Sequence, residues 1–131
     1  MKKLLAKEIP LNILIAEDNL INQKLMLDVL AHQGYQCDSA ASGFEVLNAV
    51  KKKEYDLILM DIQMPGMSGE ETMQSVRELL AEKSPKIIAV TAYAMAEDRE
   101  KYLQAGMDGY LSKPFKVDAL VLEIRRVING N

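Results

Sequence analysis

The 131-residue sequence has no tryptophan, a single cysteine, a single histidine and only two phenylalanines. Because Cys37 has no second cysteine to pair with, the chain is not a disulfide-stabilised secreted scaffold, and a reducing, cytoplasmic compartment is expected. No apolar run reaches the length needed to cross a membrane, so no membrane contact is expected of this domain itself. The net charge of −3 gives no support to nucleic-acid binding.

The residues that are present are those of an ordinary globular domain. Hydrophobic residues make up 49% of the chain and charged residues 27%, and the length suits one domain with a buried core. Charged residues interrupt segment 1–10 before an apolar stretch forms, so we expect a leader or linker there, followed by one domain over residues 11–131. Strand-like and helix-like segments alternate five times in that domain, which predicts an α/β fold with a parallel sheet covered on both faces.

The expected strands are residues 12–16, 35–40, 56–61, 86–91 and 109–112, and the expected helices are residues 20–33, 43–52, 69–80, 97–105 and 117–128. The spacing in the first helix predicts that Ile21, Leu25 and Val29 face the core. Helix 97–105 has a thin apolar face, so we expect it to be the least firmly packed element.

Acidic residues stand at the ends of two of these strands. Asp61 ends an apolar strand and is followed closely by Pro65-Gly66, and Glu17 and Asp18 follow another apolar run. Because parallel strands bring their carboxyl ends to one edge of a sheet, the three carboxylates are expected to converge there. Such a concentration of negative charge requires a cation, which predicts a Mg²⁺ site, with Mn²⁺ as a possible substitute.

Two further polar residues end the remaining strands of that edge. Thr91 ends the fourth strand, and Lys113 follows the fifth. A carboxylate such as Asp61 can attack phosphorus and form an acyl phosphate, while a hydroxyl and an ammonium group can bind the oxygens of the transferred phosphoryl group. Each residue alone has an ordinary structural explanation, but the whole set in this order favours phosphoryl transfer to Asp61.

These residues lie in stretches that resemble the receiver domains of two-component response regulators. The matching stretches, between about residues 11 and 128, are Ile13-Leu14-Ile15-Ala16-Glu17-Asp18-Asn19, Asp56-Leu57-Ile58-Leu59-Met60-Asp61-Ile62-Gln63-Met64-Pro65, Ile87-Ile88-Ala89-Val90-Thr91-Ala92 and Leu111-Ser112-Lys113-Pro114-Phe115. The resemblance implies a flavodoxin-like fold with strand order 2-1-3-4-5 and five helices. The segments 91–100 and 106–110 look most like receivers attached to hybrid sensor histidine kinases.

The resemblance also implies a role for each matching residue. Asp61 would be the phosphoacceptor, and Glu17, Asp18, Asp61 and the Gln63 carbonyl would be the metal ligands. Thr91 would be the switch hydroxyl.

Lys113 would contact the phosphoryl group through a loop in which the Lys113-Pro114 peptide bond is cis. Tyr110 would be the aromatic residue whose orientation follows that of Thr91. Gln63 and Tyr93 would tune the access of the hydrolytic water.

The implied function is that of a signalling module in a phosphorelay rather than an enzyme. The phosphodonor would be a histidine kinase or a histidine phosphotransfer domain. A downstream protein would recognise the surface formed by the fourth helix, the fifth strand and the fifth helix of the domain.

Other classes of protein fit the sequence less well. A Mg²⁺-dependent phosphatase with an aspartyl nucleophile commonly places an acid two residues after the nucleophile, where this chain has Gln63. A flavin- or nucleotide-binding module would have a glycine-rich loop where Glu17-Asp18-Asn19 stands. A histidine phosphotransfer protein is excluded by the surroundings of its only histidine, His32. A phosphorylation-independent interaction domain stays as an alternative, although the retained acids, Thr91 and Lys113 speak against it.

Overall fold

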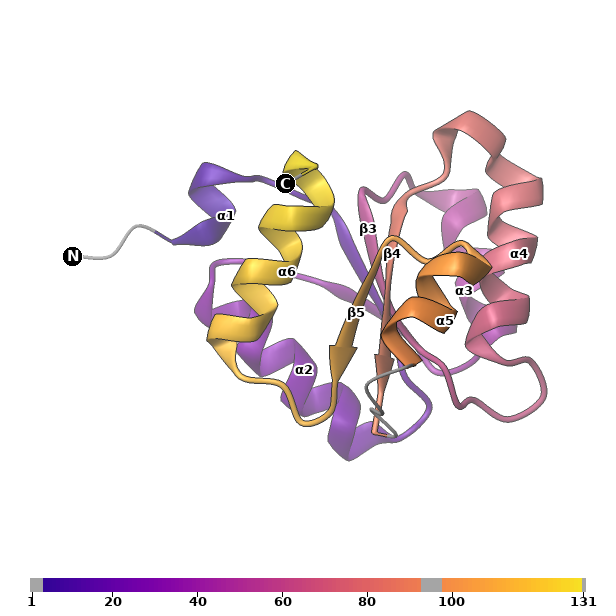
Figure 1. The fold of residues 1–131 in the computed structure, drawn as a ribbon, viewed down its shortest axis with the longest axis horizontal. Helices are drawn as coiled ribbons and strands as arrows, with labels where there is room; N and C mark the ends of the chain where they lie inside the picture. Colours follow the sequence, from indigo (N-terminus) through magenta and orange to yellow (C-terminus); the bar gives the residue numbers. More distant parts are fainter. Residues whose placement is uncertain (1–3, 93–97, 131) are drawn as a thin grey trace.

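The computed structural model describes residues 4–92 and 98–130. Its five strands form one parallel sheet in the order β2-β1-β3-β4-β5 (Figure 1). The strands are β1 (Ile13–Ala16), β2 (Asp38–Ala40), β3 (Leu57–Asp61), β4 (Lys86–Thr91) and β5 (Gly109–Ser112). This is the flavodoxin-like order expected from the sequence.

The helices follow the strands in alternation, with one addition at the start of the chain. They are α1 (Leu5–Glu8), α2 (Leu20–His32), α3 (Gly43–Lys52), α4 (Gly69–Leu80), the short 3₁₀ helix η1 (Ala81–Lys83), α5 (Asp98–Ala105) and α6 (Val117–Asn129). None of the helices within the described ranges is long and apolar enough to cross a membrane.

All five expected helices are present, and the described residues also include α1, which lies in the segment expected to be a leader or linker. Leu5 is buried in the core, and the Ala6 amide donates to the Gln33 carbonyl at 2.9 Å. The Tyr35 hydroxyl donates to the Ile9 carbonyl at 2.6 Å. One turn of helix is too short to give a periodic pattern, so only its tertiary contacts reveal it. The assignment of residues 1–10 as a linker stays a prediction.

The sheet separates two apolar clusters, one on each face. On one face α1, α2 and α6 pack together, and on the other α3, α4 and α5 do (Figure 1). Strands β1 and β3 are buried along their whole length, and β4 is buried after its first residue. Continuous burial of both faces explains why these strands are apolar runs rather than alternating patterns.

The predicted inward face of α2 is wrong for Ile21 and Leu25, although Val29 is partly buried and packs against the core as predicted. Ile21 and Leu25 are 73% and 57% exposed, whereas Met26 and Leu30 are buried against the sheet. The helix has two adjacent apolar stripes at helical spacing, and periodicity alone does not determine which of them faces the sheet. Helix α6 buries a single stripe at helical spacing, formed by Leu120, Ile124 and Val127.

Candidate functional site

The carboxyl ends of β1 and β3 lie side by side and bring three acids together. Ala16 of β1 pairs with Met60 of β3, so the residues that follow, Glu17 and Asp61, emerge beside each other. Carboxylate oxygens of Glu17, Asp18 and Asp61 all lie within 4.8 Å of one another. Glu17 and Asp61 are buried, although acids are rarely buried without a partner. The convergence of the three acids expected from their strand-end positions is therefore present.

Lys113 supplies positive charge to this cluster. Its Nζ forms a hydrogen-bonded ion pair with Glu17 Oε1 and lies 3.3 Å from Asp61 Oδ1. The loop that carries Lys113 is attached to β4 by a hydrogen bond of 2.8 Å from the Lys113 amide to the Thr91 carbonyl, and the Lys113-Pro114 peptide bond is cis. Because one ammonium group faces at least two carboxylates, the cluster keeps a negative charge that a cation can offset.

Thr91, which carries a hydroxyl group, lies at the end of β4, the strand that neighbours β3 on the side away from β1. It is buried and pairs with Ser112 of β5, while Val90 pairs with Asp61. The β-sheet register thus places Thr91 one residue beyond the level of Asp61 on the neighbouring strand. Tyr93, expected to tune hydrolysis, lies outside the described residues.

The loop after Asp61 is held close to the strand end by α4. A β-carbon on Gly69 would lie 2.5 Å from the Asp61 carbonyl oxygen, so only glycine allows this approach. Ser68 and Glu71 form a reciprocal capping box that begins α4 at this point. The backbone N–H of the exposed Gln63 donates a hydrogen bond of 3.1 Å to Asp61 Oδ1. These contacts hold the Asp61 side chain and the following loop in a defined arrangement.

The chemistry of the donor set fits a hard divalent cation. Mg²⁺ is bound in proteins by a few carboxylate and carbonyl oxygens, with water completing its coordination. Glu17, Asp18 and Asp61 provide three such carboxylates at one point of the sheet edge. Cysteine and histidine, which favour zinc and other softer metals, contribute no ligand to this group.

Tyr110 lies on β5 with its ring turned toward α5. The ring stacks on Tyr102 of α5, with centroids 5.8 Å apart. The Tyr110 hydroxyl is buried without a hydrogen-bond partner among the described residues. Burial, followed by the nearby charge of Asp98, raises the pKa of this hydroxyl.

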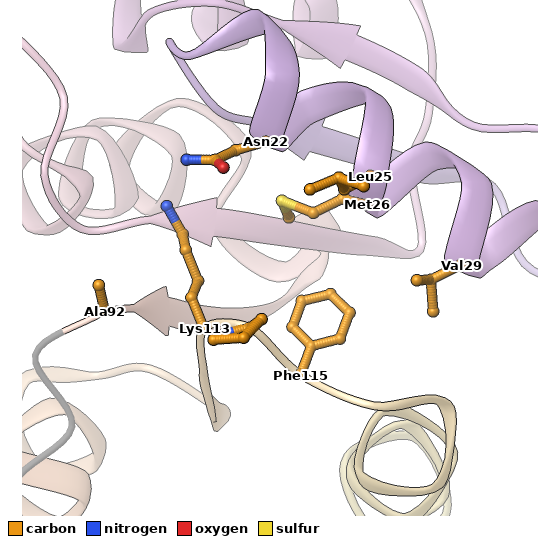
Figure 2. A pocket seen from close by; sticks show the side chains of 8 residues that line it. Asn22, Leu25, Met26, Val29, Ala92, Lys113 and Phe115 are labelled. Carbon is orange, nitrogen blue, oxygen red and sulfur yellow. The ribbon is translucent and has the colours of Figure 1, made fainter.

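A groove of about 380 Å³ opens beside the acid cluster, between α2 and the loop after β5. Figure 2 shows Leu25, Met26 and Val29 on one wall and Phe115 on the other, with the Lys113 side chain extending toward Asn22. The groove is mostly apolar and reaches the residue that is ion-paired with Asp61. The sequence does not predict this groove, because its formation requires the outer stripe of α2 to be exposed.

The chain matches the family model for the response regulator receiver domain over residues 13–125. The chain belongs to the receiver domain family. It is 41% identical over 108 residues to the sensor histidine kinase RcsC of Salmonella typhi, an alignment that covers 82% of this chain but only 11% of that kinase. The chain therefore corresponds to a small part of such relatives.

Solved receiver structures resemble the whole domain. The receiver domain of sensor histidine kinase PA1611 from Pseudomonas aeruginosa PAO1, which has a magnesium ion coordinated in its active site cleft, has a TM-score of 0.80 and 37% identity. That match covers 91% of this chain and 98% of the other. A chain of the co-crystal structure of Saccharomyces cerevisiae Ypd1, a histidine phosphotransfer protein, with the receiver domain of Ssk1 matches with a TM-score of 0.74 and 33% identity. It covers 83% of this receiver and 82% of that chain.

Proposed function

We propose that this receiver accepts a phosphoryl group on Asp61 from a phosphohistidine and passes the signal on through its α5-β5-α6 surface. The observation that carries the proposal is the contact of Lys113 with Asp61 and Glu17 beside Asp18. An ammonium group and a group of three acids around one strand-end carboxylate suit phosphoryl transfer better than they suit a purely structural role.

The chemical step is a displacement at phosphorus. Asp61 Oδ1 is already engaged by the Gln63 amide and by Lys113, so Oδ2 is the oxygen that we expect to attack. The new bond joins Oδ2 to phosphorus, the phosphorus–nitrogen bond of the phosphohistidine breaks, and its electron pair returns to the imidazole of the donor. The product is an acyl phosphate on Asp61.

Two residues of the site would hold the transferred group. The Lys113 ammonium, which lies 3.3 Å from Asp61 Oδ1, and the Thr91 hydroxyl, at the end of the strand next to that of Asp61, each bind one phosphoryl oxygen. Glu17, Asp18, Asp61 and the Gln63 carbonyl would hold Mg²⁺. When bound, the cation offsets the repulsion between these acids and the incoming phosphoryl group.

The phosphodonor is proposed to be a histidine kinase or a histidine phosphotransfer domain that docks on α2. Leu20, Ile21 and Leu25 are exposed on this helix, and the groove beside them leads to Lys113. A contiguous exposed apolar surface is characteristic of a protein-binding site. A protein that presents a phosphohistidine at Asp61 must come close to this surface, because it borders the same edge of the sheet.

Phosphorylation would act on the output surface through charge. The phosphoryl group adds about −1.5 to −2 of charge. We propose that Thr91 moves toward it, that Tyr110 changes position with Thr91, and that α5 shifts. A downstream protein would then recognise the altered α5-β5-α6 surface.

In this proposal the domain is a cytoplasmic signalling module rather than an enzyme. Residues 1–10 connect it to other segments. Gln63 and Tyr93 set the lifetime of the acyl phosphate.

Incubation with acetyl phosphate and Mg²⁺ tests the central step. Intact-mass measurement should show one added phosphoryl group, stable in acid and lost in base. Asp61→Asn should abolish the addition, and Asp28→Asn, the same change on the exposed surface of α2, should leave it intact. Repeated turnover of acetyl phosphate without an adduct would instead indicate a phosphatase, and an unmodified folded protein would indicate a phosphorylation-independent interaction domain.

A further inference from the structure

A second buried carboxylate, outside the acid cluster, lies where three elements of the output surface meet. Glu123 projects from α6 and is buried. Its Oε2 accepts a hydrogen bond of 2.6 Å from the backbone amide of Tyr110 in the edge strand β5. Arg126 on the same helix donates to both carboxylate oxygens, at 3.0 and 2.9 Å. Glu123 therefore binds the free edge of the sheet at the residue whose side chain is proposed to respond to Thr91.

The backbone of β5 is shaped to receive this carboxylate. A β-carbon on Gly109 would lie 2.8 Å from Glu123 Oε2 and 2.7 Å from Val127 Cγ2. Any other residue at that position would push Glu123 away from the strand. The close approach of Glu123 to β5 thus depends on the absence of a side chain at Gly109.

The third contact of Glu123 is made with α5. Arg99 Nη2 lies 3.6 Å from Glu123 Oε2, and the Arg99 side chain is 44% exposed while that of Glu123 is 9% exposed. This contact is longer than the other two and involves a solvent-exposed partner. It is consequently the one most easily broken when α5 moves, whereas the bonds to Tyr110 and Arg126 keep Glu123 in place.

We infer that Glu123 is a positioning residue that, through Arg99, holds the first turn of α5 against α6 as long as Lys113 is ion-paired with the free Asp61 carboxylate. The inference rests on the proposed function and deepens it. An Arg99–Glu123 ion pair that is present in the unphosphorylated domain and lost in the phosphorylated one stabilises the unphosphorylated arrangement. It therefore opposes phosphorylation. Because coupling between two sites is reciprocal, weakening the pair should favour phosphorylation of Asp61.

Arg99→Ala is the main test, because Glu123 keeps its other partners when Arg99 is removed. The expected result is an increase of about 1.5-fold to 5-fold in the affinity for beryllofluoride, a phosphoryl analogue, and in the rate of phosphorylation by acetyl phosphate, as for the loss of one partly exposed ion pair. A loss of packing alone would lower stability without raising this affinity.

The matched control is Arg125→Ala. Arg125 lies on α6 and pairs with Glu8 at 2.8 Å, on the side of the helix that faces α1 rather than α5. This variant removes one positive charge and one ion pair, and its beryllofluoride affinity should equal that of the unchanged protein. If Arg99→Ala shows the same or a lower affinity than Arg125→Ala, the inference is overturned.

Glu123→Gln provides a second measurement. Glutamine can still accept the Tyr110 amide but cannot pair with Arg99, so its affinity should rise as in Arg99→Ala. Glu123→Gln also removes the ion pair with Arg126, which lies within α6. The double variant should show no further increase in affinity, because the Arg99–Glu123 pair is already lost in either single variant. Additive increases would overturn the inference. A wild-type domain that takes no phosphoryl group at Asp61 would refute the proposed function itself, which is distinguishable from an unchanged Arg99→Ala variant.

Discussion

Helices α2 and α6 have 13 residues each and cover the same face of the sheet, yet they use their apolar residues differently. Helix α6 buries Leu120, Ile124 and Val127 and leaves one large apolar side chain, Leu122, exposed. Helix α2 buries Met26 and Leu30 and exposes three large apolar side chains, Leu20, Ile21 and Leu25. Most of the apolar residues of α6 are buried in the core, whereas several large apolar residues of α2 remain exposed to solvent.

The surplus apolar surface of α2 lies beside the acid cluster, where a phosphodonor would have to approach. Folding does not require these side chains, and their exposure costs the domain solubility. The comparison therefore separates residues that maintain the fold from residues available to a partner. Four measurements test this distinction.

The largest difference is expected in stability. Ile124→Ala should lower the free energy of unfolding by about 2–5 kcal/mol, because it leaves a cavity in the core. Ile21→Ala, the same change at an exposed position of α2, should alter it by no more than about 0.5 kcal/mol. Urea denaturation of both variants measures the difference. Similar losses in the two variants would mean that α2 packs as tightly as α6.

The next largest effect is expected in phosphotransfer. Leu25→Ala should slow transfer from a phosphorylated histidine phosphotransfer domain by about tenfold, since truncating a central interface residue typically costs more than 1 kcal/mol. Phosphorylation by acetyl phosphate, which needs no docking surface, should be unchanged. Leu122→Ala, at the exposed leucine of α6, is the control and should leave both rates unaltered. Equal slowing with both phosphodonors would place the defect in the site rather than in docking.

A smaller effect concerns the hydrogen bond that joins the segment after α2 to the segment after α1. Tyr35→Phe removes the hydrogen bond to the Ile9 carbonyl and should cost about 0.5–1.5 kcal/mol at neutral pH. Burial raises the pKa of Tyr35 to about 12. The folded state therefore retains the proton where the unfolded state loses it, and this contribution to stability disappears as the pH rises from about 10 to 12. The variant should lose less stability over that interval than the unchanged protein, as followed by thermal unfolding.

The smallest effect concerns acid stability and α6. Burial acts to raise the pKa of Glu123, but its hydrogen bonds with Arg126 and with the Tyr110 amide lower the pKa overall. A lowered pKa stabilises the fold above the ordinary value for glutamate, and this stabilisation is lost as the pH falls through the lowered pKa. Glu123→Gln should therefore show a weaker loss of stability on acidification than the unchanged protein. An identical pH dependence would show that Glu123 does not contribute.

Most of the fold was predictable because each element carried a local signal. The strand β4 and the helices α3 and α4 begin and end at the residues expected from the sequence. Strand β2 is shorter than expected, since only Asp38–Ala40 pairs with β1. Helix α1 could not be predicted, because a single turn has no period and is stabilised only by contacts with α2 and α6.

The candidate site was predictable for a different reason. Its acids, Thr91 and Lys113 stand at strand ends, and the topology of a parallel sheet gathers strand ends at one edge. Glu123 and Arg99 had no such signal, because charged residues on helices are ordinarily solvated. Their contact depends on how α5 and α6 flank β5, which no local pattern describes.

The order of residues along the chain was sufficient to specify the strands, most of the helices and the edge on which the acids meet, since hydrophobic period and strand-end position are local properties. Which stripe of α2 faces the sheet, and whether a carboxylate on α6 reaches the edge of β5, were decided only by tertiary packing. Two stripes of similar hydrophobicity are equally suited to face the sheet, and the packing of the neighbouring helices determines which one does.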